Sequence, residues 1–141
     1  MTSDSDRAAA LARLREEMER PPFHRVLAPQ AVRADPATGV VVIRLPYQPH
    51  LSRAPDEASY HGGVIATLID LAGHAAVAVS IGRMAPTIDL RIDYLRPADN
   101  SDLTATATLI KAGRSVARAD IEITDGQGRL IAMGRGSFST S

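Results

Sequence analysis

The chain of 141 residues contains no cysteine and carries no net charge, because 16 basic side chains balance 16 acidic ones. Without cysteine there is no disulfide, no thiolate nucleophile and no cysteine-type zinc site. A balanced charge gives no electrostatic reason to expect nucleic acid or an anionic membrane as a partner. The N-terminus also lacks the apolar stretch of a signal peptide, so a cytoplasmic location is expected.

Long hydrophobic runs are rare as well. There is one, at residues 64–81, and its only ionisable side chains are Asp70 and His74. Its length of about 18 residues touches the lower limit of a membrane span. The ionisable residues and the glycines in and around it favour a helix buried in a globular domain. An unpaired carboxylate inside such a helix is costly or changes its pKa, so Asp70 is a candidate functional residue.

The remaining pattern predicts a single α+β domain with one core. Residues 3–20 form an amphipathic helix that Pro21-Pro22 ends, and residues 47–60 form an irregular loop. Residues 87–94 alternate strictly between apolar and polar, which places Thr87 on the polar face. One curved antiparallel sheet wrapped around the apolar helix satisfies these patterns. Strands are expected at residues 26–32, 40–45, 87–94, 103–110, 115–124 and 130–138.

Two motifs make a family recognisable. The first runs from His61-Gly62-Gly63 to Asp70, and the second is the proline-ended strand at residues 85–97. Together with the later strands, these motifs resemble the hotdog-fold acyl-CoA thioesterases of the phenylacetate-degradation type.

The resemblance covers most of the chain and has consequences for architecture and assembly. It implies a hotdog domain at residues 23–141, in which a curved antiparallel sheet wraps around one long buried helix. An additional amphipathic helix at residues 1–22 precedes that domain. The resemblance also implies an acyl-CoA substrate, no cofactor, and assembly into homodimers and homotetramers.

The family's catalytic roles transfer to matching positions. The resemblance implies that Asp70 activates a water molecule or attacks the thioester directly, and that the Gly62 N–H donates to the thioester oxygen. It also implies that Thr87, which opens the strand after the helix, helps to hold the water. Many members carry asparagine six residues before the motif histidine. This chain has Pro55 there, with Asp56 beside it, which leaves open how the water is positioned.

The residues themselves also suit thioester chemistry. Hydrolysis needs a polarised carbonyl and a nucleophile, and it requires no metal and no cofactor. The glycines at positions 62 and 63 leave N–H groups that can face a bound oxygen atom, or they can serve close packing. Gly62 and Asp70 lie eight residues apart, about 12 Å along a helix. Because one chain can hardly bring the Gly62 N–H and the Asp70 carboxylate to the same substrate, we expect a dimer. Each site then combines Gly62 from one chain with Asp70 from the other.

Several candidate residues also have structural interpretations. Asp70 and His74 are one helical turn apart, so they can form an internal pair, and the same pair can carry out acid–base chemistry. His74 can equally be a wall of the substrate pocket. His61 either orients the loop before the helix or acts as a catalytic acid. Thr87 can be an ordinary strand residue.

The candidates for substrate binding are less specific. The basic side chains among them can meet the phosphates of coenzyme A or can simply be solvated. The full set is Asp56, Gly63, His74, Arg96, Lys111 and Arg114.

Three functions remain open from the residues alone. The leading one is an acyl-CoA thioesterase for a small or medium acyl group, aromatic groups included. A second is an enoyl-CoA hydratase or dehydratase on the same fold, with Asp70 and His74 transferring the proton. The third is a non-catalytic acyl-CoA-binding protein, which would not need a buried carboxylate.

Overall fold

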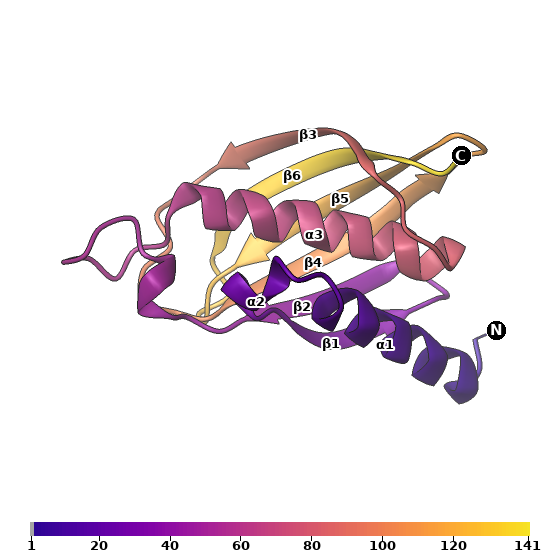
Figure 1. The fold of residues 1–141 in the computed structure, drawn as a ribbon, viewed down its shortest axis with the longest axis horizontal. Coiled ribbons are helices and arrows are strands. Elements are labelled where there is room, and N and C mark those ends of the chain that lie inside the picture. The colour runs from indigo at the N-terminus through magenta and orange to yellow at the C-terminus, as the bar shows by residue number, and fades with distance from the viewer. Residues whose placement is uncertain (1) are drawn as a thin grey trace.

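One six-stranded sheet and one long helix dominate the computed structural model, which describes residues 2–141 (Figure 1). The predicted curved antiparallel sheet around a central helix is confirmed. The elements are α1 Asp4–Glu19, α2 His24–Leu27, β1 Gln30–Asp35, β2 Val40–Leu45, the 3₁₀ helix η1 Pro49–Leu51, α3 Gly62–Ile81, β3 Thr87–Tyr94, β4 Leu103–Ala112, β5 Val116–Thr124 and β6 Leu130–Ser139.

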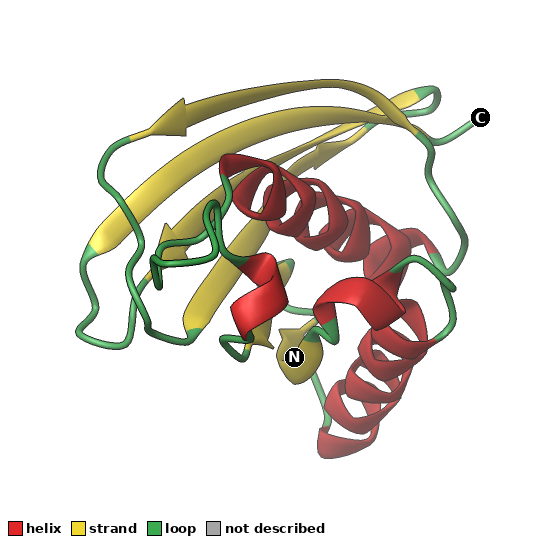
Figure 2. Ribbon diagram, turned by 60° about the vertical axis from the view of Figure 1, so that its left-hand side comes forward, coloured by secondary structure: helices red, strands yellow, loops and turns green. Residues whose placement is uncertain are grey.

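The strands lie in the order β1-β2-β4-β5-β6-β3, and every neighbouring pair is antiparallel. The sheet bends around α3, which fills its concave side (Figure 2). The two edges of the sheet are therefore β1 and β3. The α1 helix packs against β1, whereas β3 contacts β6 on one side and leaves its other edge unpaired within the described chain.

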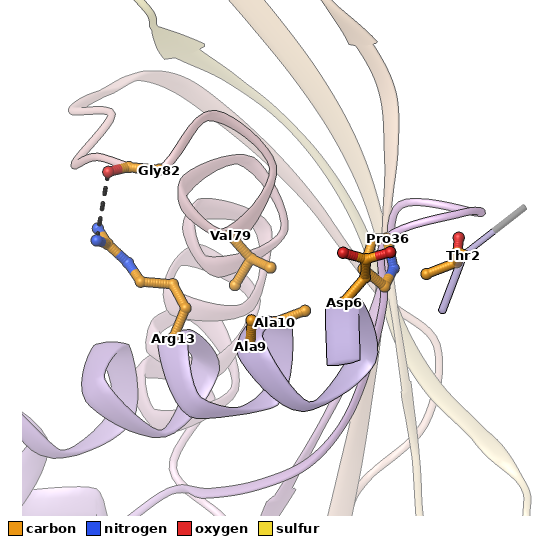
Figure 3. Close-up of a pocket in the computed structure, with 8 residues that line it drawn as sticks. All are labelled: Thr2, Asp6, Ala9, Ala10, Arg13, Pro36, Val79 and Gly82. Carbon is orange, nitrogen blue, oxygen red and sulfur yellow. Dashed lines mark hydrogen bonds between the residues drawn. The ribbon is translucent and has the colours of Figure 1, made fainter. Parts of the chain in front are cut away.

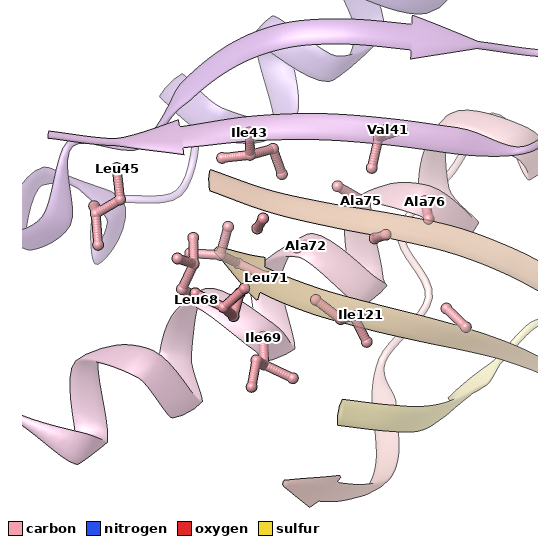
Figure 4. Packing of buried hydrophobic residues seen from close by; sticks show 14 of the residues in the cluster. Val41, Ile43, Leu45, Leu68, Ile69, Leu71, Ala72, Ala75, Ala76 and Ile121 are labelled. Atoms are coloured by element: carbon pink, nitrogen blue, oxygen red, sulfur yellow. The ribbon is translucent and has the colours of Figure 1, made fainter. Parts of the chain in front are cut away.

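The core lies between α3 and the inward face of the sheet. Its central residues are fully buried aliphatic side chains and alanines. Because alanine is small, the helix packs close to the strands. Figure 4 shows this packing for Val41, Ile43, Leu45, Leu68, Ile69, Leu71, Ala72, Ala75, Ala76 and Ile121.

Two glycines set the distance between α3 and the sheet. A Cβ atom added to Gly73 of α3 would lie 2.9 Å from both Phe138 Cζ and Ile121 Cδ1. A Cβ atom added to Gly134 of β6 would overlap Ile69 Cγ2 of α3 and lie 3.2 Å from the carbonyl oxygen of Arg91. Glycine within a strand is typical of such a close approach between two elements.

The α1 helix begins and ends as the sequence predicts. Ser3 caps it and forms a reciprocal capping box with Asp6. On its inner side, Leu14 is fully buried in the core. The Arg13 guanidinium donates to the carbonyl oxygen of Gly82 at 3.3 Å, beside a cavity of about 530 Å³ (Figure 3). A hydrogen bond therefore joins the interior of α1 to Gly82, the C-cap of α3.

The strand predicted at residues 26–32 is wrong in its first half. Residues His24–Leu27 form the short helix α2, and β1 begins at Gln30. Ala28 takes a left-handed conformation with φ 55°, and Pro29 follows it. Because proline disfavours the helical conformation of the residue before it, the segment divides into a helix and a strand there. The loop predicted at residues 47–60 is confirmed, except that it contains the η1 turn.

The strict alternation predicted for residues 87–94 is interrupted in β3. The register with β6 shifts between Thr87 and Asp89, which leaves Ile88 as an extra residue and pairs Thr87 with the buried Phe138. Such a β-bulge re-aims the neighbouring side chain. Thr87 therefore faces α3, and its predicted position on the polar outer face is wrong.

The α3 helix also has the length and composition of a membrane span, with a mean hydropathy of 1.9 over its most apolar window. Within the domain, however, 56% of that window is buried. The predicted role of this segment as a core helix accounts for its hydropathy.

We predict that Gly134→Ala lowers the free energy of unfolding by about 1–3 kcal/mol, because the added methyl group must push α3 away from β6. Denaturant unfolding measures the change. Gly62→Ala is the matched control, since a Cβ atom there makes only ordinary contact with Tyr94 at 3.6 Å. Equal stability of the two variants would contradict a glycine-set distance between helix and sheet.

Candidate active site

Asp70 lies in the middle of α3, on the side that faces β3. The Thr87 hydroxyl, at the start of β3, donates to Asp70 Oδ1 at 2.8 Å. Asp70 is half-buried, whereas the sequence predicted a helix enclosed on every side. The difference arises because α3 residues spaced about one helical turn apart, including Thr67 and His74, form a stripe on the helix. This stripe is only partly covered in a single chain.

The start of α3 presents a backbone donor. His61 is the N-cap, and its Nδ1 accepts a hydrogen bond from the Gly63 N–H at 2.8 Å. Val64 N–H binds the His61 carbonyl oxygen at 2.9 Å. In the described part of the chain, the Gly62 N–H has no acceptor, as expected for the first residue of a helix. The His61 side chain thus caps α3, and its orienting and catalytic roles stay predictions.

His74 does not pair with Asp70. Its Nε2 accepts the Ala85 N–H at 3.1 Å, so the neutral ring carries its proton on Nδ1, which lies 3.7 Å from Glu17 Oε2 of α1. Burial lowers the pKa of His74, although the Glu17 and Asp70 carboxylates oppose that effect. In place of the internal Asp70–His74 pair expected from the sequence, Asp70 contacts Thr87, and His74 contacts Ala85 and faces Glu17.

The remaining sequence-predicted binding residues do not converge within one chain. Arg96 lies near the start of α3, in a shallow cavity of about 390 Å³ that Gly62 also lines. Asp56 is exposed in the loop before α3. Lys111 and Arg114 flank the exposed end of the β4–β5 hairpin, far from the start of α3 (Figure 1). Contacts of these cations with coenzyme A phosphates remain a prediction.

Two residues near the site, Tyr94 and Glu17, are not among those that the sequence predicts. The Tyr94 hydroxyl donates to the Gly62 carbonyl oxygen at 2.7 Å and so anchors the start of α3 to β3. Glu17 of α1 faces His74, and two hydrogen bonds from Arg13 hold its carboxylate, at 2.7 and 3.1 Å. Glu17 lies outside both motifs. Tyr94 lies within the second motif, but its contact with Gly62 joins distant segments and cannot be read from its position in the strand.

This geometry suits acyl transfer to water. A fixed carboxylate can take a proton from water or attack an electrophilic carbonyl, and an uncommitted backbone N–H can stabilise an oxyanion. Within one chain the two groups are about 12 Å apart along α3. A single chain therefore holds both parts of such a site but does not bring them together.

The fold and this site define the class: a hotdog domain whose central helix begins at a glycine pair and carries a carboxylate. The model of the thioesterase superfamily matches residues 59–132, and the chain belongs to that family. It is a thioester hydrolase.

Individual relatives agree with this assignment. The chain is 31% identical over 133 residues to the medium/long-chain acyl-CoA thioesterase YigI of Salmonella typhimurium, covering 83% of this chain and 84% of that protein. The structure of the Escherichia coli PaaI protein from the phenylacetic acid degradation operon superposes with a TM-score of 0.82 at 26% identity, over 94% and 93% of the two chains. Zebra fish Thioesterase Superfamily Member 2 gives 0.80 at 29% identity, over 93% and 95%.

We predict that Thr87→Val lowers kcat for thioester hydrolysis roughly ten- to a hundredfold, because Asp70 loses a charge-assisted hydrogen bond. Thr87→Ser, which keeps the hydroxyl, should retain most of the activity. Steady-state release of free thiol measures both variants. A valine variant as active as the serine variant would show that the hydroxyl has no part in the reaction.

Proposed function

We propose that this protein hydrolyses medium-length acyl-CoA thioesters to the free acid and coenzyme A. The observation that carries the proposal is the Asp70 carboxylate, half-buried on an otherwise apolar helix and held by Thr87. The medium-chain assignment is supported by the similarity to YigI, whose name states a medium/long-chain acyl-CoA substrate. The neutral, separately bonded His74 gives no support to a hydratase that needs an Asp70–His74 pair.

In the proposed reaction, Asp70 either takes a proton from the attacking water or attacks the thioester carbon itself. The Thr87 hydroxyl holds the carboxylate and helps to place the water. The carbonyl oxygen gains negative charge as the tetrahedral intermediate forms, and the Gly62 N–H of the partner subunit stabilises it. The intermediate then collapses, and the thiolate of coenzyme A leaves and takes up a proton. Where water attacked, this step gives the free acid directly. Where Asp70 attacked, water then hydrolyses the acyl–Asp70 anhydride, which releases the free acid and restores the carboxylate.

The exposed edge of the sheet supports a dimer. The β3 strand has eight residues and no strand beyond it in the described chain, and an apolar side chain near each of its ends is more than half exposed. Ile88 is 55% exposed and Tyr94 53%. A long apolar edge strand is a template for pairing with another chain. We therefore place the dimer interface along β3, where a second β3 continues the sheet.

The symmetry of such a pairing would bring the two halves of the site together. Along one chain, α3 and β3 run in opposite directions, with Gly62 bonded to Tyr94 at one end and Asp70 bonded to Thr87 at the other. An antiparallel β3 pair centred on its midpoint sets the partner subunit's Tyr94 opposite Thr87. Gly62 of the partner subunit, held by that tyrosine, then lies toward Asp70.

We predict that Asp70→Asn lowers thiol release from octanoyl-CoA by about 10²- to 10⁴-fold, because the amide can neither accept the proton nor attack. The variant should fold normally, since the amide oxygen can still accept the Thr87 hydroxyl. The matched control is Asp89→Asn, an exposed carboxylate two residues beyond Thr87 in the same strand, which should keep wild-type activity. Full activity of Asp70→Asn would remove Asp70 from the mechanism.

Gly62→Pro tests the oxyanion donor, because proline at the first helical position keeps the helix but has no N–H. His61 already has φ −61° and ψ 134°, the conformation that a following proline requires. We expect kcat to fall by about 10²- to 10³-fold. Gly62→Ala keeps the N–H and has room for its methyl group, so it should remain active.

Mixing the two inactive variants tests the shared site. In a dimer of one Asp70→Asn chain and one Gly62→Pro chain, one of the two sites would combine an intact Gly62 with an intact Asp70. Random exchange of subunits should therefore restore roughly a quarter of wild-type activity. An inactive mixture, after mass spectrometry has confirmed mixed dimers, would contradict a site shared between chains.

A further inference from the structure

A cavity of about 630 Å³ lies one helical turn from Asp70, between the end of α1 and the segment that joins α3 to β3. His74 forms part of its wall, and Met84 lies on the joining segment. The α3 helix, which carries Asp70, and the segment that leads to Thr87 both contribute residues to the lining of the cavity. Thr87 binds Asp70 at 2.8 Å, and two residues earlier the Ala85 N–H binds His74 at 3.1 Å.

The polar groups nearest to Asp70 in this cavity already satisfy one another. Arg13 is hydrogen-bonded to Glu17 and to the carbonyl oxygen of Gly82, so its charge is compensated. The neutral His74 directs its Nδ1 toward the same Glu17 carboxylate. This part of the wall therefore has no uncompensated charge and no donor reserved for a polar ligand.

The other side chains that line the cavity are three apolar ones and two arginines. Pro21 and Pro22 follow the end of α1, and the Met84 side chain is 70% exposed beside them. A flexible, largely uncovered methionine suits contact with an apolar ligand of variable length. Of the two arginines, Arg20 pairs with Glu16 at 3.8 Å, and Arg83 donates to the carbonyl oxygen of Thr140.

We infer that the acyl chain of the substrate runs from Asp70 past His74 into this cavity, so that Met84 and the end of α1 determine the acyl-chain length the enzyme accepts. The inference rests on the proposed function. A volume of 630 Å³ falls within the range of about 300–1,000 Å³ that is typical of small-molecule sites. An acetyl group would leave most of that space to water, whereas a medium-length unbranched chain fills it.

Met84→Trp tests this assignment, because a larger side chain at an exposed position shortens the cavity without burdening the core. The substrates are straight-chain acyl-CoAs from acetyl to palmitoyl. In the wild type, we expect kcat/KM to rise about fourfold for each methylene that enters the cavity. In Met84→Trp the rise should stop at a shorter chain, with a loss of about tenfold for longer substrates and unchanged values for the shortest.

Two further variants make the test specific. Met84→Ala lengthens the cavity and should move the optimum toward longer chains. Met133→Trp introduces the same bulk on β6, on the outer face of the sheet, and should leave the chain-length profile unchanged.

The outcomes separate this inference from the proposed function. Wild-type hydrolysis combined with an unchanged profile in Met84→Trp, or with an equal loss for all chain lengths, overturns the assignment of the cavity and leaves the thioesterase proposal standing. Preference for an acyl chain that ends in a carboxylate, over the unmodified chain of equal length, overturns it as well, because Arg20 and Arg83 would then bind the ligand. A wild-type protein that hydrolyses no acyl-CoA overturns both.

Discussion

The close approach of α3 to the sheet is the constraint on which the rest of the structure depends. Gly73 on the helix and Gly134 on β6 leave no room for a Cβ atom, so side chains of the sheet pack directly on the helix backbone at Gly73, and Ile69 of the helix packs directly on the strand backbone at Gly134. Because β3 hydrogen-bonds to β6, this contact also fixes where β3 lies beside α3. The position of Asp70 relative to Thr87 follows from packing in the core.

Three hydrogen bonds then join α3 to β3 and its preceding segment: Tyr94 to Gly62, Thr87 to Asp70 and Ala85 to His74. They hold the free N–H, the carboxylate and the neutral imidazole along one side of the helix. The β-bulge at Ile88 is part of this arrangement, since regular alternation would turn Thr87 away from the helix. Family membership gives the reaction class. We propose that the side chains around this row, including those that α1 contributes, distinguish one acyl group from another.

The sequence predicted most of the architecture because the long elements have strong periodicity. Residues of α1, α3 and the last four strands lie where their patterns indicate, within a few residues at each end. Where prediction was wrong, a local feature overrode the pattern: Pro29 divided an apparent strand, and a one-residue bulge reversed the face of Thr87. Tyr94 and Glu17 could not be found from the sequence, because each acts on a residue more than thirty positions away.

By itself, the sequence determined which residues are candidates for the chemistry: a lone carboxylate in an apolar helix and a glycine pair at its start are both local features. Only the tertiary structure decided what those residues contact, since hydrogen-bond partners depend on how distant segments pack. In the folded chain, Asp70 accepts a hydrogen bond from Thr87 and does not pair with His74. The stripe of α3 around Asp70 stays half-exposed. It also left the β3 edge unpaired within one chain.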